Sequence, residues 1–158
     1  MTAAQSVMPL PDQPSPHFTW SPEFECHDVT GTQYPLDWRV LRGVPLAIEL
    51  ERIRSRIGPF TPTSVFRTWD WHVAIYARMN PKQTPPPTSG HLFGRAADVP
   101  WVPSEHMPTW ESFRAGILAA AREPGSKLTY IRFYRHDSFA HVEMRPSFTA
   151  IKVEYEAT

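Results

Sequence analysis

The sequence is short of cysteine, of net charge and of long apolar runs, and each shortage excludes something. Its 158 residues include one cysteine, Cys26, which cannot form an internal disulfide, so stability must come from packing, from a metal or from both. Sixteen basic residues balance sixteen acidic ones, which leaves no overall field to attract nucleic acid or anionic lipid. No stretch approaches the roughly 18 apolar residues of a membrane span. We therefore expect neither membrane insertion nor a nucleic-acid partner.

The first residues, MTAAQSVMPLPDQPSP, lack the positively charged start and the apolar stretch of a secretory signal. We therefore expect synthesis in the cytoplasm without export through the Sec system. The prolines and the weak apolar periodicity of residues 1–17 predict an extended or disordered N-terminal arm. Residues 18–158 have the usual size of one domain, so a single domain is predicted there.

Eighteen prolines divide the chain into short elements, because proline costs about 3 kcal/mol inside a helix. Apolar residues at helical spacing and end signals predict three helices, at 45–57, 69–79 and 109–122, the last with Thr109 as N-cap. Short β-branched or alternating runs predict strands at 61–66, 129–134, 139–144 and 150–156. Residues 80–90, with four prolines, are predicted to form a loop. Together these elements indicate an α+β domain with a small, mainly antiparallel sheet.

Candidate metal ligands stand in two segments, SGHLFGRAAD with His91 and Asp98, and FAHVEM with His141. Imidazole nitrogen and carboxylate oxygen are normal zinc ligands, and three protein ligands with one open position are typical of a catalytic zinc site. Side chains alternate along a strand, so His141 and Glu143 are predicted to share one face. Glu143 would then face the metal together with His141.

These segments resemble the zinc D-Ala-D-Ala carboxypeptidase-like peptidases, which are related to the lysostaphin-type endopeptidases and to the hedgehog signalling domain. Four segments carry the resemblance: FTWSPEFECHD (18–28), SVFRT (64–68), the Ser-x-His-x-x-Gly-x-Ala-x-Asp run (89–98) and YRHDSFAHVEMR (134–145). The third is the most specific, because it fixes the spacing of two ligands and the small residues around them. The resemblance implies the D-Ala-D-Ala carboxypeptidase/hedgehog-like fold, with a zinc site on one face of the sheet and helices on the other.

The resemblance also implies roles for individual residues. His91, Asp98 and His141 correspond to the zinc ligands of the family. Arg67 corresponds to the residue that polarises the scissile carbonyl or anchors the substrate carboxylate, a role that suits the permanent charge and planar donor fork of arginine. Ser89 would help to position the substrate or a ligand.

The chain departs from the family pattern at Ser138. Many relatives place the catalytic glutamate three residues before the last histidine, and a serine there cannot act as a base. In our interpretation Glu143 replaces it, with Asp137 and His136 as alternatives. A surface ion pair between Glu143 and Arg145, worth less than about 1 kcal/mol, is the structural alternative for this glutamate.

Two further groups of residues invite a functional interpretation. Cys26, His27 and Asp28 have the composition of a nucleophile triad, but adjacent residues of an extended segment point in opposite directions and cannot form one. His72 falls on a predicted helix beside aromatic residues, which favours packing over substrate contact. Neither group is predicted to carry the chemistry.

The resemblance therefore predicts a zinc metallopeptidase that hydrolyses D-amino-acid-containing stem or cross-bridge peptides of peptidoglycan, and it leaves carboxypeptidase and endopeptidase action open. Without a secretory signal, such an enzyme would reach the cell wall by holin release or as a virion component, which suggests a phage lysin or virion-associated peptidase. Its partners would be peptidoglycan peptides and other virion or tail proteins. The alternative is a catalytically weak or inactive tail component that keeps the fold, and Ser138 is its best support.

Overall fold

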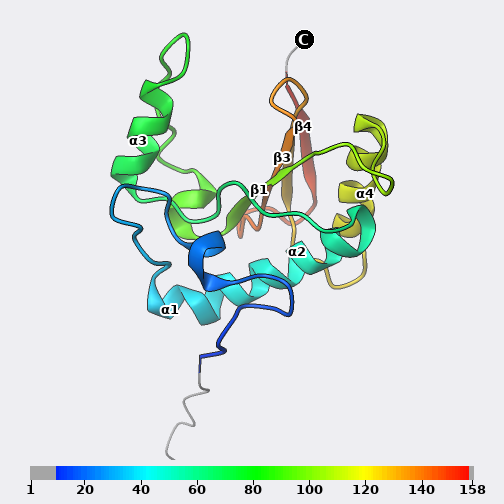
Figure 1. Ribbon diagram of the computed structural model, residues 1–158, viewed down its shortest axis with the longest axis horizontal. Coiled ribbons are helices and arrows are strands. Elements are labelled where there is room, and N and C mark those ends of the chain that lie inside the picture. Colours follow the sequence, from blue (N-terminus) through cyan, green and yellow to red (C-terminus); the bar gives the residue numbers. More distant parts are fainter. Residues whose placement is uncertain (1–9, 157–158) are drawn as a thin grey trace, which may run out of the picture.

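The computed structural model describes residues 10–156 of the chain and shows an α+β arrangement around one small sheet (Figure 1). In chain order its elements are η1 (Trp20–Phe24), α1 (Leu36–Trp38), η2 (Arg39–Gly43), α2 (Val44–Ile57), α3 (Trp69–Ala77), η3 (Gly90–Phe93), β1 (Ala96–Pro100), α4 (Trp110–Ala121), β2 (Tyr130–Tyr134), β3 (Phe139–Glu143) and β4 (Lys152–Tyr155). Among the helices of this described part, none is long and apolar enough to cross a membrane.

The sheet has the strand order β1-β3-β2-β4. β3 is a central strand that pairs antiparallel with both β1 and β2, whereas β4 pairs parallel with β2. The sheet is therefore mixed, with two antiparallel pairs and one parallel pair. Its register places His141 opposite Asp98 on one side and opposite Arg132 on the other. Directly paired residues project to the same face, so these three polar residues lie in one row across the sheet.

The other face of the sheet carries the core. Its side chains are buried and apolar: Ala97, Val99, Ile131, Phe133, Ala140 and Val142. They belong to one cluster with the apolar faces of α2 and α4, and Trp110 of α4 meets Phe133 edge to face with ring centroids 6.0 Å apart. Figure 1 shows α2 and α4 together at one side of the sheet and α3 on the opposite side. Because the core covers this face, the row of polar residues lies on the opposite face of the sheet, away from the core.

Six of the predicted elements are found in the structure, within a few residues of their predicted ends: the helices α2, α3 and α4 and the strands β2, β3 and β4. Thr109 is the N-cap of α4 as predicted, and its side chain accepts from the amide of Ser112, whose hydroxyl accepts from the Thr109 amide in return. This reciprocal capping satisfies two donors that a helix start leaves without partners.

The strand predicted at 61–66 is wrong. This segment is extended, but its contact with the sheet is a single bridge between Ser64 and Asp98. The Asp98 amide donates to the Ser64 carbonyl at 2.8 Å, and the Thr63 amide donates to the Asp98 carbonyl at 3.0 Å. Pro62 has no amide hydrogen to extend the ladder. The segment is therefore a short support for β1 at the position of Asp98.

The predicted N-terminal arm falls partly outside the described residues, which begin at residue 10. Further along it, the hydroxyl of Ser15 and the amide of His17 each donate to Oε1 of Glu51 at 2.8 Å. Glu51 belongs to α2. Residues 15–17 are thus attached to the helix that covers the core.

The core predicts a stability difference between two leucines. Leu50 is fully buried in α2, whereas Leu41 is 70% exposed. The Leu50→Ala variant should lose about 2–5 kcal/mol of unfolding free energy, because it removes buried methyl groups and leaves a cavity. The control Leu41→Ala should stay within about 0.5 kcal/mol of the parent. Urea denaturation measures both, and equal losses would contradict this account of the core.

Candidate metal centre

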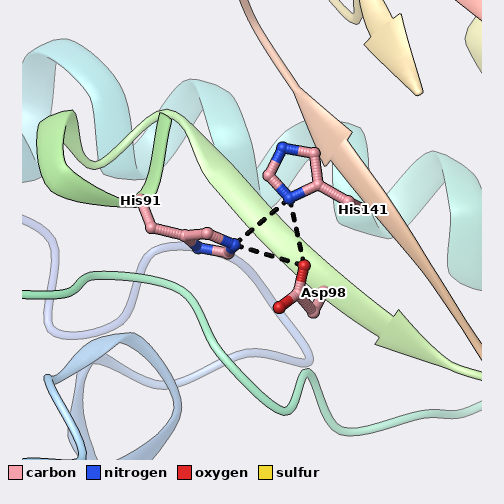
Figure 2. A group of neighbouring side chains, drawn as sticks. All are labelled: His91, Asp98 and His141. Carbon is pink, nitrogen blue, oxygen red and sulfur yellow. Dashed lines mark hydrogen bonds and ion pairs between the residues drawn. The ribbon is translucent and has the colours of Figure 1, made fainter. Parts of the chain in front are cut away.

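Three side chains from separate parts of the sequence meet on the polar face of the sheet: His91, Asp98 and His141 (Figure 2). Oδ1 of Asp98 lies 3.2 Å from Nε2 of His91 and 3.1 Å from Nδ1 of His141, and the two nitrogens are 3.2 Å apart. Each residue offers one ligand atom, and these atoms all lie within 4.8 Å of one another. The three predicted ligands therefore converge on one point and could hold a metal ion.

His91 is oriented by the main chain around it. It lies in η3 directly after Gly90, and its imidazole is buried. Nδ1 donates to the carbonyl of Val65 at 2.7 Å, and the His91 carbonyl accepts from the amide of Arg67 at 3.1 Å. A neutral imidazole carries one proton, so a donating Nδ1 leaves the lone pair on Nε2. That lone pair points at the cluster, as a metal ligand requires.

Asp98 divides its two oxygens between the histidines and an arginine. Oδ1 faces the imidazoles, whereas Oδ2 pairs with Nη2 of Arg67 at 3.1 Å. Nε of Arg67 donates in turn to Oγ of Ser64 at 2.8 Å. Arg67, for which the resemblance predicts a role on the substrate, therefore contacts a candidate ligand directly.

The charges of the cluster suit a cation. Burial acts to raise the pKa of Asp98, but the imidazoles of His91 and His141 outweigh it and hold that pKa below its ordinary value. Burial lowers the pKa of His91. Burial also acts to lower the pKa of His141, but the carboxylates of Asp98 and Glu143 outweigh it and raise that pKa. An ionised Asp98 beside a neutral His91 suits metal binding, whereas His141 has to lose a proton when a metal binds.

Glu143 lies beyond His141, away from the other ligands. Its Oε2 is 3.5 Å from Nε2 of His141 and accepts from Nε of Arg145. The ion pair of Glu143 with Arg145 is therefore present, but its prediction as a surface pair is wrong, since Glu143 is 2% exposed. The reason is that Gly90 packs against the carboxylate while Arg145 pairs with it.

A cavity of about 410 Å³ opens beside the cluster and is lined by all three candidate ligands. Its polar and aromatic walls include the side chains of Arg67, Tyr76, Tyr130, Arg132, Tyr134 and Arg145. This volume lies in the usual range for small-molecule sites. Burial raises the pKa of Tyr134 to about 12, so its hydroxyl stays protonated and can donate a hydrogen bond to a ligand.

Comparisons of the chain with protein-family models, with curated proteins and with solved structures find no match. The family resemblance of the motifs therefore stays a hypothesis. What the site can bind is therefore inferred from its own side chains and their surroundings.

The remaining predicted site residues differ in whether they line this cavity. Ser89 and Asp137 line it, whereas among the described residues His136 and Ser138 do not. The backbone amide of His136 donates to the carboxylate of Glu156 at 3.1 Å. Ser138 occupies the turn between β2 and β3 with a φ of 57°, a left-handed conformation that few residues other than glycine adopt. Of the alternatives for a base, Asp137 is the one at the cavity.

Sequence reasoning missed the contribution of β2. Tyr130, Arg132 and Tyr134 alternate along this strand and all line the cavity. Their period of two residues was visible in the sequence. Their position opposite His141 was not, because it depends on which strands pair and in which register.

The two other groups behave as predicted. Cys26 is buried and the adjacent His27 is exposed, so they face opposite ways and form no nucleophile pair. His72 is buried in α3, where its Nε2 donates to the carbonyl of Pro86 at 3.0 Å. The centroid of its ring lies 4.8 Å from that of the Tyr76 ring. His72 thus attaches the proline-rich loop to α3.

The cluster predicts one metal equivalent per chain. Zinc at about 100 times its dissociation constant should raise the unfolding free energy by about 2.7 kcal/mol. His91→Ala and Asp98→Ala should each abolish this increase, since each removes a ligand atom, whereas His27→Ala, an exposed histidine outside the cluster, should keep it. Denaturation with and without zinc measures the effect. An increase that survives in both cluster variants would place the metal elsewhere.

Adding a side chain at Gly90 is predicted to destabilise the fold. A Cβ at this position would lie 2.0 Å from Oε1 of Glu143, so the carboxylate would have to shift from its buried ion pair with Arg145. Gly90→Ala should therefore cost about 1–3 kcal/mol of unfolding free energy, as overpacking does elsewhere. Urea denaturation measures the loss, and unchanged stability would mean that Glu143 does not pack against Gly90.

Proposed function

We propose that this chain is a zinc-dependent peptidase that hydrolyses stem or cross-bridge peptides of peptidoglycan. The observation that carries the proposal is the convergence of two imidazole nitrogens and one carboxylate oxygen within 4.8 Å beside a cavity. The motif resemblance from residue 89 to 98 and from 134 to 145 supplies the substrate class.

Zinc is the metal that this donor set favours. Two histidines with one carboxylate are a known catalytic zinc combination, and nitrogen donors are less suited to calcium or magnesium. When bound, zinc would supply Lewis-acid chemistry, polarising a carbonyl and lowering the pKa of a water molecule toward about 7. The buried position of His91 and Asp98 would keep competing solvent away from these ligands.

The chain's own residues would supply orientation and charge. The guanidinium of Arg67 balances Asp98 and lines the cavity, where it would stabilise negative charge that develops on a substrate oxygen. Arg132 and Arg145 line the same cavity and would attract the carboxylate groups of stem peptides. The hydroxyls of Tyr130 and Tyr134 would donate or accept hydrogen bonds along the peptide.

Proton transfer needs a carboxylate within reach of the substrate. Of the carboxylates in residues 10–156, Asp98 and Asp137 line the cavity and Glu143 does not. Because Asp98 is committed to the histidines and to Arg67, we assign proton transfer to Asp137. This assignment replaces the interpretation of Glu143 as the base.

The biological setting belongs to the same proposal. A zinc site on the polar face of the sheet, with α2 and α4 on the core face, is consistent with the D-Ala-D-Ala carboxypeptidase/hedgehog-like fold. The enzyme would be made in the cytoplasm and act at the cell wall, by holin release or as part of a virion or tail. Both carboxypeptidase and endopeptidase action are compatible with the open cavity.

A second candidate is a catalytically weak or inactive structural component of a phage particle. Ser138 favours it, because this serine stands where the family places its catalytic glutamate. Such a protein would still bind metal through the same cluster. Activity, and not metal binding, separates the two candidates.

The test is hydrolysis of purified peptidoglycan, followed by the release of new amine termini. The zinc-loaded chain should release them, and a chelator should stop the release. Asp137→Asn should lower the rate by about 10²–10⁴-fold, as loss of a general base does, and keep its zinc. Asp37→Asn, an exposed aspartate in α1, is the matched control and should keep the parent rate.

Release that persists without metal would contradict the zinc mechanism. A zinc-loaded chain that releases no amine termini would favour the structural component. An Asp137→Asn variant as active as the parent would remove Asp137 from proton transfer.

A further inference from the structure

His141 uses both of its ring nitrogens. Nδ1 lies 3.1 Å from Oδ1 of Asp98 and 3.2 Å from Nε2 of His91, on the side where the ligand atoms converge. Nε2, on the other side of the ring, lies 3.5 Å from Oε2 of Glu143. The imidazole is thus placed between the metal cluster and a carboxylate that belongs to its own strand.

The carboxylate of Glu143 is buried and paired. Its residue is 2% exposed, and Oε1 packs so closely against Gly90 that a Cβ there would lie 2.0 Å away. Oε2 accepts from Nε of Arg145, whose guanidinium stacks over the ring of Tyr130 with 3.6 Å to the centroid. Packing on one side and an ion pair on the other therefore hold the carboxylate beside His141.

Glu143 also does not line the cavity beside the cluster. The cavity beside the cluster is lined by His141, and among the described residues Glu143 lines a different cavity of about 320 Å³, together with Gly90, Arg95 and Arg145. In the cluster, the contact of Glu143 is with Nε2 of His141, the ring nitrogen that faces away from Asp98. An effect of Glu143 on the cluster would pass through this imidazole.

We infer that Glu143 is a positioning residue, which accepts the Nε2 proton of His141 and so leaves the Nδ1 lone pair for the metal. Histidine ligands commonly donate their second ring N–H to a carboxylate or a carbonyl, which fixes the tautomer and increases the basicity of the ligand. The Val65 carbonyl does this for His91 through the opposite nitrogen. The two histidines would therefore present different nitrogens, Nε2 of His91 and Nδ1 of His141, because their partners lie on opposite sides of the cluster. This inference rests on the metal binding of the proposed function.

Zinc affinity, measured by competition with a chromogenic chelator, tests the inference without any substrate. Glu143→Leu removes the acceptor and should weaken zinc binding by about 10–100-fold. Glu143→Gln keeps an oxygen that can accept from Nε2 and should weaken it by less than about 10-fold. Glu154→Gln, a carboxylate of β4 that pairs with Arg132, is the matched control and should bind zinc as the parent does.

A second readout needs no variant. Nitrogen-15 chemical shifts of the zinc-loaded parent chain should show His141 protonated at Nε2 and His91 protonated at Nδ1. In Glu143→Gln the His141 tautomer should persist, and in a folded Glu143→Leu it should become mixed. A parent His141 that carries its proton on Nδ1 would overturn the inference even if Glu143→Leu does not fold.

The outcomes separate this inference from the peptidase proposal. If the parent binds zinc and Glu143→Leu weakens that binding, the inference holds even when peptidoglycan is not hydrolysed. If Glu143→Gln keeps its zinc but loses about 10²–10⁴-fold in hydrolysis, Glu143 is a proton-transfer residue and the inference is wrong. A parent chain that binds no zinc overturns both.

Discussion

The antiparallel pairing of β1 with β3 is the interaction on which the site depends. It sets Asp98 opposite His141, so two candidate ligands that are distant in sequence become direct neighbours on one face. A shift of one residue in this register would turn one of them into the core. The register is fixed from the core face, where the small and branched side chains of Ala97, Val99 and Val142 are fully buried.

Around this pair, each ligand is held by a group that does not itself reach the common point. The Val65 carbonyl orients His91, Arg67 pairs with Asp98, and Glu143 contacts His141. Burying charged groups is costly unless they are paired and hydrogen-bonded. The charges of the cluster are thus compensated on its outer side, which is the arrangement that metal centres commonly show, and the cluster could hold a cation.

Sequence patterns predict the candidate ligands and most of the elements, because both leave local signals. Helix caps, proline positions and the spacing of His91 and Asp98 can be recognised one segment at a time. The burial of Glu143 could not be recognised in this way, since it depends on Gly90, which is distant in sequence, packing against its carboxylate. The same holds for Arg132, which enters the cavity through its pairing with His141. Information about strand order is spread over the whole chain, and no single segment contains it.

X-ray absorption at the zinc edge, on the chain loaded with one equivalent, tests the central claim most directly. The account predicts only nitrogen and oxygen neighbours at about 2.0–2.2 Å, with the multiple-scattering signature of two imidazoles. A sulfur neighbour at about 2.3 Å would assign the metal to Cys26, and a spectrum without imidazole scattering would exclude His91 and His141 as ligands. Either result would contradict a metal centre built on the pairing of β1 with β3.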